Sequence, residues 1–421
     1  MSRDQYEAGH GKDPFFLQLS TLQGVLEAAP TMAKAFVFAE LERTDSDMEY
    51  AVRTHLIPLA ELCRKQGTAK IYLRTKNVFW NANCYEDLWR DTLLSGRYRD
   101  VFVPSMEETN CRTQEISLSG RTGLWMAGLF DHVSARAVTD NATFSRFWET
   151  SPQQIQSHHL RHLALNAALG ADIFLVNNYQ GDPLGYLPFI DMVEKGAIFI
   201  PRRGDLLSVS GLCLGMKSPM LYFLEHGSNG HDMNGFEPGR GPAVFDRLDC
   251  YWAGSPAAEH DFSRYAMGTE RRMLNFLPPN PYGLIASVPA ETPIGPDLPF
   301  QAMIVTDGEV FYDDSGRPVP APEYMPIAQR KLLEAAEDMP LLVRGGAAWA
   351  AARVDPAHIR VTLIDPGYIS PADRAAQIVL QRIKGLGCRD ILSGEEIRLK
   401  DGVAHLTVPA GALRIVDIEH E

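Results

Sequence analysis

The sequence predicts an α/β fold in which a (β/α)8 TIM-type barrel is followed by a small antiparallel β-sandwich domain. Two observations lead to this prediction. Apolar segments of strand length alternate with amphipathic helical segments through most of the 421 residues, which is the pattern of parallel α/β architectures. After about residue 338, short strands follow one another between Gly, Pro and Asp turns, which is typical of an antiparallel sandwich.

Strand-like and helix-like segments follow one another in order along the first part of the chain. The segments that read as strands are 14–20, 34–40, 70–80, 101–107, 133–140, 171–178, 208–215, 283–290 and 302–308. The segments with helical spacing between the earlier strands are 49–67, 85–100, 114–130, 151–170 and 187–196. A barrel of this type has eight strands, so one of the nine strand assignments is in excess.

A closed barrel is favoured over a nucleotide-binding sheet because no phosphate-binding loop is present. No GxGxxG follows the first strand, and no Walker sequence occurs in the chain. The predicted barrel domain spans 1–338 and contains a long loop insertion, 217–281, rich in Gly, Pro and aromatic residues. The segment 322–338 is expected to form a bridging helix, and 339–421 the sandwich.

Composition excludes several classes of partner. The formal net charge is −13 without a run of like charges, which argues against nucleic acid. No apolar run reaches the roughly 18–20 residues of a membrane helix. The polar N-terminus lacks a signal-peptide core, which predicts a cytoplasmic protein or a secreted one whose leader has been removed. The six cysteines form no CxxC pair, so neither a metal centre nor a disulfide framework is expected, and no cofactor.

Carboxylates close several of the predicted strands. In a barrel the active site lies at the carboxyl ends of the strands, and these ends carry Glu40, Glu107, Glu108, Asp140, Glu291 and Asp307. Hydrolysis of a glycosidic bond needs one protonated and one ionised carboxyl group. We therefore expect Glu108 and Asp140 to be catalytic, with Glu107 as the alternative to Glu108. A competing interpretation is that these acids only mark where strands reach solvent.

Other residues near the strand ends have side chains suited to binding a sugar. Aromatic faces stack on apolar sugar faces, cations bind anionic substituents, and amides bind hydroxyls. The predicted substrate-binding residues are Trp80, Arg74, Lys76, Asn141, Asn178, His231, Tyr251 and Trp252. Arg202 and Arg203 are further candidates for an anionic substrate, and a solvated turn is their alternative. His158 and His162 have the i, i+4 spacing of metal ligands, but no Glu lies between them, and a packing or surface role is preferred.

Several stretches resemble a known enzyme type. These are "GRTGLWMAGLFDHVSARAVTDN" (120–141), "HHLRHLALNAALGADIFLVNN" (158–178), "PYGLIASVPA" (281–290) and "IRVTLIDPGY…VPAGALRIVDIE" (359–368 and 408–419). They resemble barrel glycoside hydrolases with a C-terminal β-sandwich, and among these the λ-carrageenase-like enzymes, which act on sulfated galactans. The resemblance implies polysaccharide hydrolysis. The order Glu107-Glu108-Thr109-Asn110 departs from the Asn-Glu pair common at the end of barrel strand four, which leaves the identity of the acid/base open.

Two other functions remain open. The first is a non-catalytic carbohydrate-binding protein on a barrel scaffold. The second is a different barrel enzyme, but a metal-dependent hydrolase needs histidine ligands at the strand ends, and an aldolase needs a strand lysine, for which only Lys76 qualifies. The expected partner is a carbohydrate substrate, without nucleic acid or membrane. The glycan, the anomeric outcome and the oligomeric state are not predicted.

Overall fold

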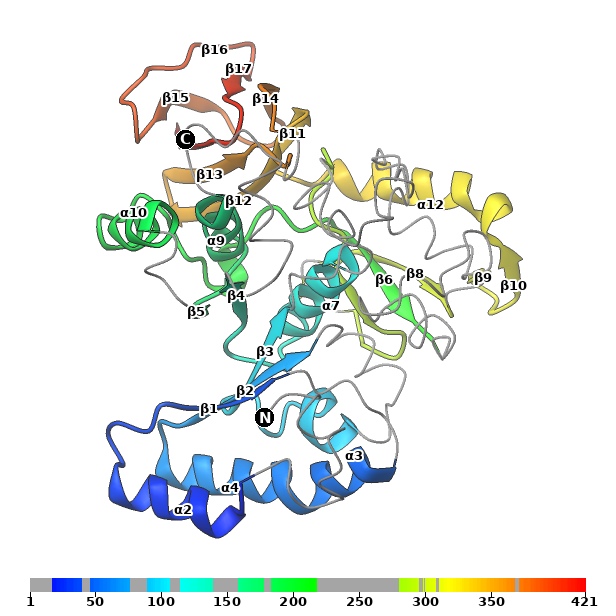
Figure 1. Ribbon diagram of the computed structural model, residues 1–421. Coiled ribbons are helices and arrows are strands. Elements are labelled where there is room, and N and C mark those ends of the chain that lie inside the picture. Colours follow the sequence, from blue (N-terminus) through cyan, green and yellow to red (C-terminus); the bar gives the residue numbers. More distant parts are fainter. Residues whose placement is uncertain are drawn as a thin grey trace, which may run out of the picture.

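The structure is a computed structural model that describes residues 17–39, 46–75, 89–106, 114–138, 158–177, 183–217, 280–294, 298, 300–307, 310–367 and 371–421. Within these ranges the chain forms two five-stranded and two four-stranded β-sheets. Figure 1 shows the first sheet beside two helices, α2 and α4, with the C-terminal strands at the opposite end of the molecule.

The first sheet is entirely parallel and has the strand order β1-β2-β3-β4-β5. Its strands are β1 (Ala35–Ala39), β2 (Lys70–Thr75), β3 (Phe102–Met106), β4 (Ser134–Val138) and β5 (Ile173–Asn177). Each strand pairs with the next one along the chain, as expected when every connection is a crossover containing a helix. A doubly wound sheet reverses its order at a switch point, and these five strands do not. The predicted parallel α/β arrangement is therefore confirmed for this part.

Two helices cover one face of β1 and β2. They are α2 (Leu19–Ala28) and α4 (Ile57–Gln66), and α3 (Ser46–Ala51) and the π-turn η1 (Val52–Leu56) lead into α4. Their buried leucines pack with Ile71 and Leu73 of β2. Gly67 ends α4 with φ 92°, and its N–H donates to the Cys63 carbonyl oxygen; glycine adopts this left-handed conformation without steric cost.

The predicted strand at 14–20 is wrong over its described part. Residues 17 and 18 are not in a strand, and Leu19 begins α2. The spacing of Leu19, Leu22 and Leu26 is helical, and Leu22 and Leu26 are buried against α4 and its neighbours. Removing this segment from the nine predicted strands leaves eight.

Three further helices follow the later strands of the first sheet. They are α7 (Gln114–Met126), α9 (His158–Ala168) and α10 (Pro183–Glu194), and they confirm the helices predicted in these regions. Of the helix predicted over 85–100, the described part is helical at Trp89 and through the π-helix η2 (Arg90–Leu94), and turns follow. Helix α7 is buried from Leu118 to Met126 and lies between the first and second sheets (Figure 1).

The second sheet has the order β10-β9-β8-β6-β7. Its strands are β6 (Leu212–Met216), β7 (Ser287–Pro289), β8 (Ala302–Thr306), β9 (Val310–Tyr312) and β10 (Pro318–Pro320). Strand β6 runs parallel to both β7 and β8, whereas β9 and β10 are antiparallel additions that the sequence did not predict. Helix α12 (Ala321–Ala336), predicted as a bridge, packs on this sheet.

The two sheets do not form a closed eight-stranded ring within the described residues. No ladder in these ranges joins β5 to β6 or β1 to β8, and β6 lies between β7 and β8. The segments that precede β4, β5 and β6 nevertheless lie close together. An Arg203 guanidinium N–H donates to the Phe130 carbonyl oxygen at 2.8 Å, and the Trp125 ring lies beneath Gly170 and Arg203.

The C-terminal part consists of two antiparallel sheets. One contains β11 (Leu341–Gly345), β14 (Arg374–Leu380), β17 (Val403–Val408) and β16 (Leu399–Lys400); the other contains β12 (Ala348–Asp355), β13 (His358–Ile364), β18 (Leu413–His420) and β15 (Gly385–Asp390). Alternate side chains of both sheets share one buried cluster that includes Val343, Trp349, Val361, Ile378 and Val416. This confirms the predicted change to antiparallel strands after residue 338.

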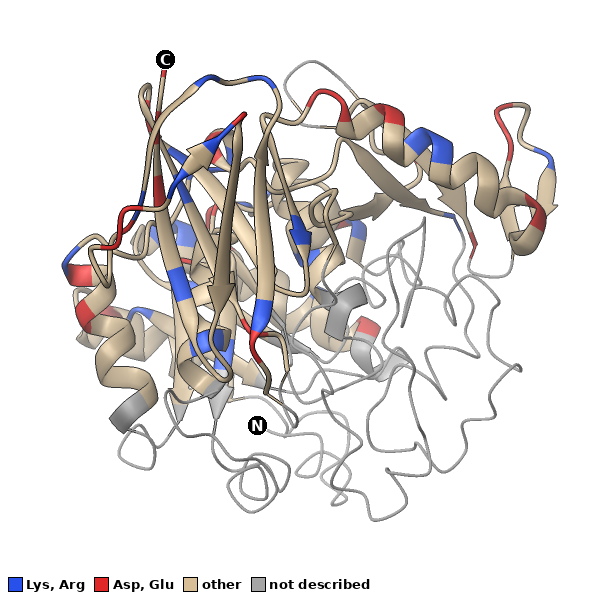
Figure 2. Cartoon of the chain, turned by 90° about the horizontal axis from the view of Figure 1, so that it is seen from above, with Lys and Arg blue, Asp and Glu red and all other residues tan. Residues whose placement is uncertain are grey.

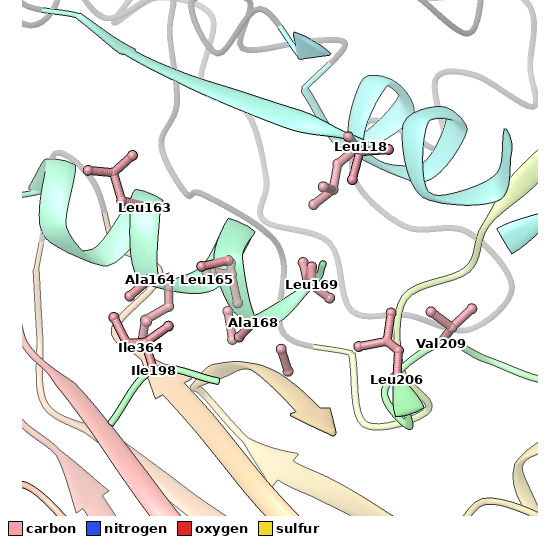
Figure 3. Packing of buried hydrophobic residues seen from close by; sticks show 14 of the residues in the cluster. Leu118, Leu163, Ala164, Leu165, Ala168, Leu169, Ile198, Leu206, Val209 and Ile364 are labelled. Carbon is pink, nitrogen blue, oxygen red and sulfur yellow. The ribbon is translucent and has the colours of Figure 1, made fainter. Parts of the chain in front are cut away.

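The C-terminal sheets share a second buried cluster with the α/β part. Figure 3 shows Ala164 and Ala168 of α9 close to Ile198 and Ile364, with Leu206 and Val209 further along the same cluster. Residues from β12 and β18, such as Ala350 and Ile415, complete it. One hydrophobic core therefore contains residues from both parts of the chain.

Candidate functional site

The carboxyl ends of five parallel strands lie at one edge of the first sheet. The last residues of β1 to β5 are Ala39, Thr75, Met106, Val138 and Asn177. Because all five strands run in the same direction, the segments that follow them leave the sheet from the same edge. In α/β folds ligands bind at this edge.

Most of the predicted site residues lie outside the described residues. This holds for the predicted catalytic residues Glu107, Glu108 and Asp140, and for Trp80, Lys76, Asn141, Asn178, His231, Tyr251 and Trp252. Of the loop insertion 217–281, only 217, 280 and 281 are described. Arg74 is described through its backbone: it is the penultimate residue of β2, between Ala39 of β1 and Ser105 of β3.

Polar side chains lie on the face of the first sheet opposite α2 and α4. The Tyr72 hydroxyl and the Ser105 hydroxyl are 2.6 Å apart, and Tyr72 also donates to the Ala135 carbonyl oxygen at 3.5 Å. Ile71 and Leu73 point to the helix-covered face, so strand alternation places Tyr72 on the other one. The polar character of Tyr72 within an apolar strand was the only sequence signal for this contact.

Arg121 is a fully buried cation close to this face. Its Nη1 donates to the Ser134 carbonyl oxygen at 2.7 Å and to Asn166 Oδ1 at 3.0 Å. In the described part of the chain, no carboxylate lies within ion-pair distance of Arg121, and its Nε and Nη2 have no hydrogen-bond partner. Burial lowers its pKa to about 10, so it stays charged at neutral pH. Ser134 pairs with Ser105, and Ser105 is the residue before Met106, which ends β3.

His159 and His162 of α9 are buried, and His162 lies near Arg121. Burial lowers the pKa of His162 to about 3, and the charges of His159 and Arg121 act in the same direction. His162 lies 3.5 Å from the Asn166 side-chain nitrogen, and His159 stacks on Tyr186. The packing role preferred for His162 agrees with these contacts. Among the described side chains, no group of three His, Cys, Asp or Glu residues could hold a metal ion.

The carboxyl ends of the second sheet carry a smaller polar group. Asp307 follows β8, and its two oxygens accept hydrogen bonds from the Val310 N–H at 3.0 Å and the Tyr312 hydroxyl at 2.7 Å. Lys217 follows β6, and its ammonium lies 4.4 Å from the centre of the Tyr312 ring. Glu291 follows β7 and is exposed. Asp307 therefore has the turn-stabilising contacts expected of an Asp before a tight turn.

Arg203 has a structural position. Besides its bond to Phe130, it lies 3.8 Å from Asp131 and over the Trp125 ring. These contacts are on the side where β4 and β6 begin, away from their carboxyl ends. This half-buried position differs from the solvated turn considered for Arg203, and its role toward an anionic substrate stays a prediction.

Two domains of one protein family together match nearly the whole chain. The lambda-carrageenase middle domain matches residues 3–301, and the lambda-carrageenase C-terminal domain matches residues 342–419. The first match alone covers more than half of the chain. The chain belongs to the lambda-carrageenase family.

Curated members of the lambda-carrageenase family align with almost all of this chain. The lambda-carrageenases of Pseudoalteromonas carrageenovora and of a Pseudoalteromonas species are each 31% identical to it over 436 residues. These alignments cover 98% of this chain and 46% of each relative. The chain thus spans about half the length of the curated family members that it matches.

None of the described helices combines the length and the apolar composition that a membrane span requires.

Solved structures similar to this lambda-carrageenase family member include glycoside hydrolases of low sequence identity. The catalytic module of a family 98 glycoside hydrolase from Streptococcus pneumoniae is 10% identical, with a TM-score of 0.48, over 96% of this chain and 82% of that one. An exo-carrageenase from Bacteroides ovatus is 10% identical, with a TM-score of 0.45, over 89% of this chain and 56% of that one.

Proposed function

We propose that this chain is a glycoside hydrolase that cleaves O-glycosyl bonds of a sulfated galactan. The observation that carries the proposal is the alignment of 98% of the chain with proteins named lambda-carrageenase at 31% identity. Both parts of the chain, 3–301 and 342–419, match domains of that family. Identity of this extent over the whole chain supports a shared chemistry and a related polysaccharide substrate.

The proposed catalytic groups are carboxylates that follow β3 and β4. Glu107 and Glu108 come one and two residues after Met106, and Asp140 comes two residues after Val138. Strands β3 and β4 are parallel neighbours, whose spacing is about 4.8 Å. Covalent connectivity therefore keeps these carboxylates near one edge of the sheet, and we assign Glu108 and Asp140 to the acid/base pair, with Glu107 as the alternative.

The buried Arg121 supports a division of protonation states between such carboxylates. A positive charge stabilises a nearby ionised carboxylate and lowers its pKa, whereas two crowded carboxylates push their pKa values apart. The Arg121 guanidinium binds the backbone at Ser134, at the level of Ser105 and two residues before Glu107. This arrangement favours one ionised group and one protonated group, as glycosidic cleavage requires.

The remaining expectations for the site and the domains are part of the same proposal. We assign substrate binding to Trp80, Arg74, Lys76, Asn141, Asn178, His231, Tyr251 and Trp252. The position of the Arg74 backbone at the carboxyl edge of β2 supports its assignment. We also propose a catalytic domain over 1–338 related to a (β/α)8 barrel, with the insertion 217–281, and a β-sandwich over 339–421. The consecutive order β1 to β5 supports the barrel relationship.

The test is hydrolysis of λ-carrageenan by the purified chain and by three variants, Glu107→Gln, Glu108→Gln and Asp140→Asn. A general acid or base contributes about 10²–10⁴-fold to the rate, so two of the three variants should lose activity to that extent. Release of reducing ends gives kcat and KM, and circular dichroism checks that each variant is folded. Glu194→Gln is the matched control, because Glu194 is an exposed carboxylate on α10.

Two results would contradict the proposal at different levels. If the parental chain released no reducing ends from λ-carrageenan or from other sulfated galactans, the proposed reaction would be wrong. If the parental chain were active and all three variants matched Glu194→Gln, the reaction would stand and the assigned carboxylates would be wrong.

A further inference from the structure

Three residues at the carboxyl ends of β6 and β8 form a polar group that the proposed catalytic residues do not include. We refer to Lys217, Asp307 and Tyr312 as the Lys217 cluster. Lys217 directly follows β6, and its N–H donates to the carbonyl oxygen of Thr306, the last residue of β8, at 2.8 Å. Asp307 directly follows β8, and Tyr312 ends the short strand β9. The cluster thus lies where ligands bind in parallel α/β sheets.

The contacts within the Lys217 cluster fix the aromatic ring and leave the ammonium accessible. Tyr312 donates its hydroxyl to Asp307 Oδ2 at 2.7 Å, and Asp307 Oδ1 accepts from the Val310 N–H. The Lys217 ammonium lies over the ring at 4.4 Å, within the range of a cation–π contact. Lys217 is exposed, and the ion pairs formed among the described residues do not include it.

The sheet register shows which face carries the cluster. Gly215 pairs with Val305, and Val305 pairs with Tyr312, so these residues lie at one level. Leu214, Ile304 and Phe311 point to the opposite face, where they pack against α12. Lys217 and Tyr312 are therefore on the face that α12 leaves uncovered. Cys213 and Met303, which share that face by alternation, pack in or against the cluster that contains α7 and α9 residues.

We propose that the Lys217 cluster binds an anionic substituent of the polysaccharide, a sulfate ester, through the Lys217 ammonium. The ammonium is a compact charge with three donors, which suits a sulfate group presented at the end of the strands. The Tyr312 ring holds the lysine side chain in place before the ligand arrives, and this lowers the entropy cost of binding. Asp307 accepts hydrogen bonds from the Val310 N–H and the Tyr312 hydroxyl, and it thereby orients the ring on which the ammonium lies. This inference rests on the proposed function, because it assigns the substrate's charge to a place in the fold.

The test measures binding separately from hydrolysis. Isothermal titration calorimetry compares sulfated galactan oligosaccharides with the same oligosaccharides after chemical desulfation, using the full chain and its Lys217→Met variant at low and moderate salt. Loss of one charge-assisted contact should weaken binding of the sulfated oligosaccharide about tenfold. Affinity for the desulfated oligosaccharide should not change. The Lys217→Arg variant keeps the charge and should bind within a few-fold of the parent, and the salt dependence should be smaller for Lys217→Met.

Lys195→Met is the matched control, because Lys195 is an exposed lysine of the helix C-terminal region that pairs with Asp191 at 2.7 Å. Its affinity for the sulfated oligosaccharide should equal that of the parent. The inference is overturned if Lys217→Met binds the sulfated oligosaccharide like the parent, if it loses both oligosaccharides equally, or if the parent binds neither. Binding that depends on Lys217 in a chain that does not hydrolyse the polysaccharide would uphold the inference and contradict the proposed hydrolase instead.

Discussion

Arg161 of α9 and Asp365 at the end of β13 meet in the fully buried interior, where the α/β part contacts the C-terminal strands. The Arg161 Nη1 atom lies 3.6 Å from Asp365 Oδ2 and donates to the Asp365 and Gly367 carbonyl oxygens at 2.7 and 2.8 Å. The Asp365 carboxylate also accepts from Arg374 Nε at 2.7 Å and from three backbone N–H groups, those of Gly367, Ala372 and Gly411. One buried carboxylate thus organises two loops of the C-terminal sheets around a cation from α9.

Removal of either partner should strongly destabilise the fold. A buried charge left without its partner costs about 3–5 kcal/mol, so Asp365→Ala and Arg161→Ala should each lower the free energy of unfolding by about that amount. Urea denaturation followed by tryptophan fluorescence measures the change. Arg382→Ala is the control, because Arg382 pairs with Asp338 at an exposed site, and its midpoint should stay near that of the parent. A loss in the buried variants no larger than in Arg382→Ala would contradict the role of this contact.

Two helical glycines should respond oppositely to substitution by alanine. A Cβ on Gly123 in α7 would lie 1.9 Å from the Ser287 carbonyl oxygen, which is backbone and cannot move aside. Gly123→Ala should therefore destabilise the protein by about 1–3 kcal/mol or more. A Cβ on Gly24 in α2 meets nothing within 4 Å, so Gly24→Ala should stabilise it by about 0.4–1 kcal/mol through helix propensity and unfolded-state entropy. Thermal unfolding shows whether each variant raises or lowers the melting temperature. Equal shifts of the melting temperature in both variants would show that α7 does not contact β7 so closely.

His162 should make the stability depend on pH in the acidic range. Burial lowers its pKa in the folded protein from 6.5 to about 3, so between these values the unfolded chain binds a proton that the folded protein does not. Its contribution is complete above pH 6.5 and is lost as pH falls toward 3, with a slope of up to about 1.4 kcal/mol per pH unit. His162→Gln should flatten the plot of unfolding free energy against pH between 6.5 and 4.

His358 provides a comparison of opposite sign. A hydrogen bond to Asp417 raises the pKa of His358 above its usual value, so its contribution is present below pH 6.5 and is lost as pH rises through the raised pKa. His358→Gln should therefore reduce stability at acidic pH more than at alkaline pH. If His162→Gln left the acidic slope unchanged, or if both variants changed the profile in the same sense, the assigned environments would be wrong.

The C-terminal strands should be indispensable for the folding of the rest. The cluster around α9 contains Ala348, Ala350, Ile364, Leu413 and Ile415 from these strands. Deletion of 339–421 would expose that apolar surface to water, which costs roughly 25 cal/mol per Å². A chain of residues 1–338 should therefore be insoluble or bind the dye ANS, whereas the full chain should not. A soluble 1–338 fragment that unfolds cooperatively would show that the two parts are independent.

The amino-acid sequence by itself determined most of the regular elements near the candidate site. Strands β1, β3, β4 and β5 and helices α7, α9 and α12 lie where apolar periodicity predicted them, because short apolar runs and helical spacing act locally. The same local reasoning failed at 14–20, where helical spacing of Leu19, Leu22 and Leu26 was read as a strand. In the C-terminal part, β15 is a Gly-containing segment that is a strand because it pairs with β18. For the candidate site, the positions of the acids after β3 and β4 in the sequence led to their assignment, and that assignment stays a prediction.

Only the tertiary structure decided which distant residues meet. The sequence did not indicate that Arg121 would be buried beside Ser134 and Asn166, that β6 would lie between β7 and β8, or that Lys217 would lie over Tyr312. Arg161 and Asp365 are 204 residues apart, and no local pattern in either segment specifies the other. The physical reason is that burial of a charge is favourable only when its partners are already in place. Those partners come from elements brought together by the hydrophobic core, so such contacts follow from the complete fold.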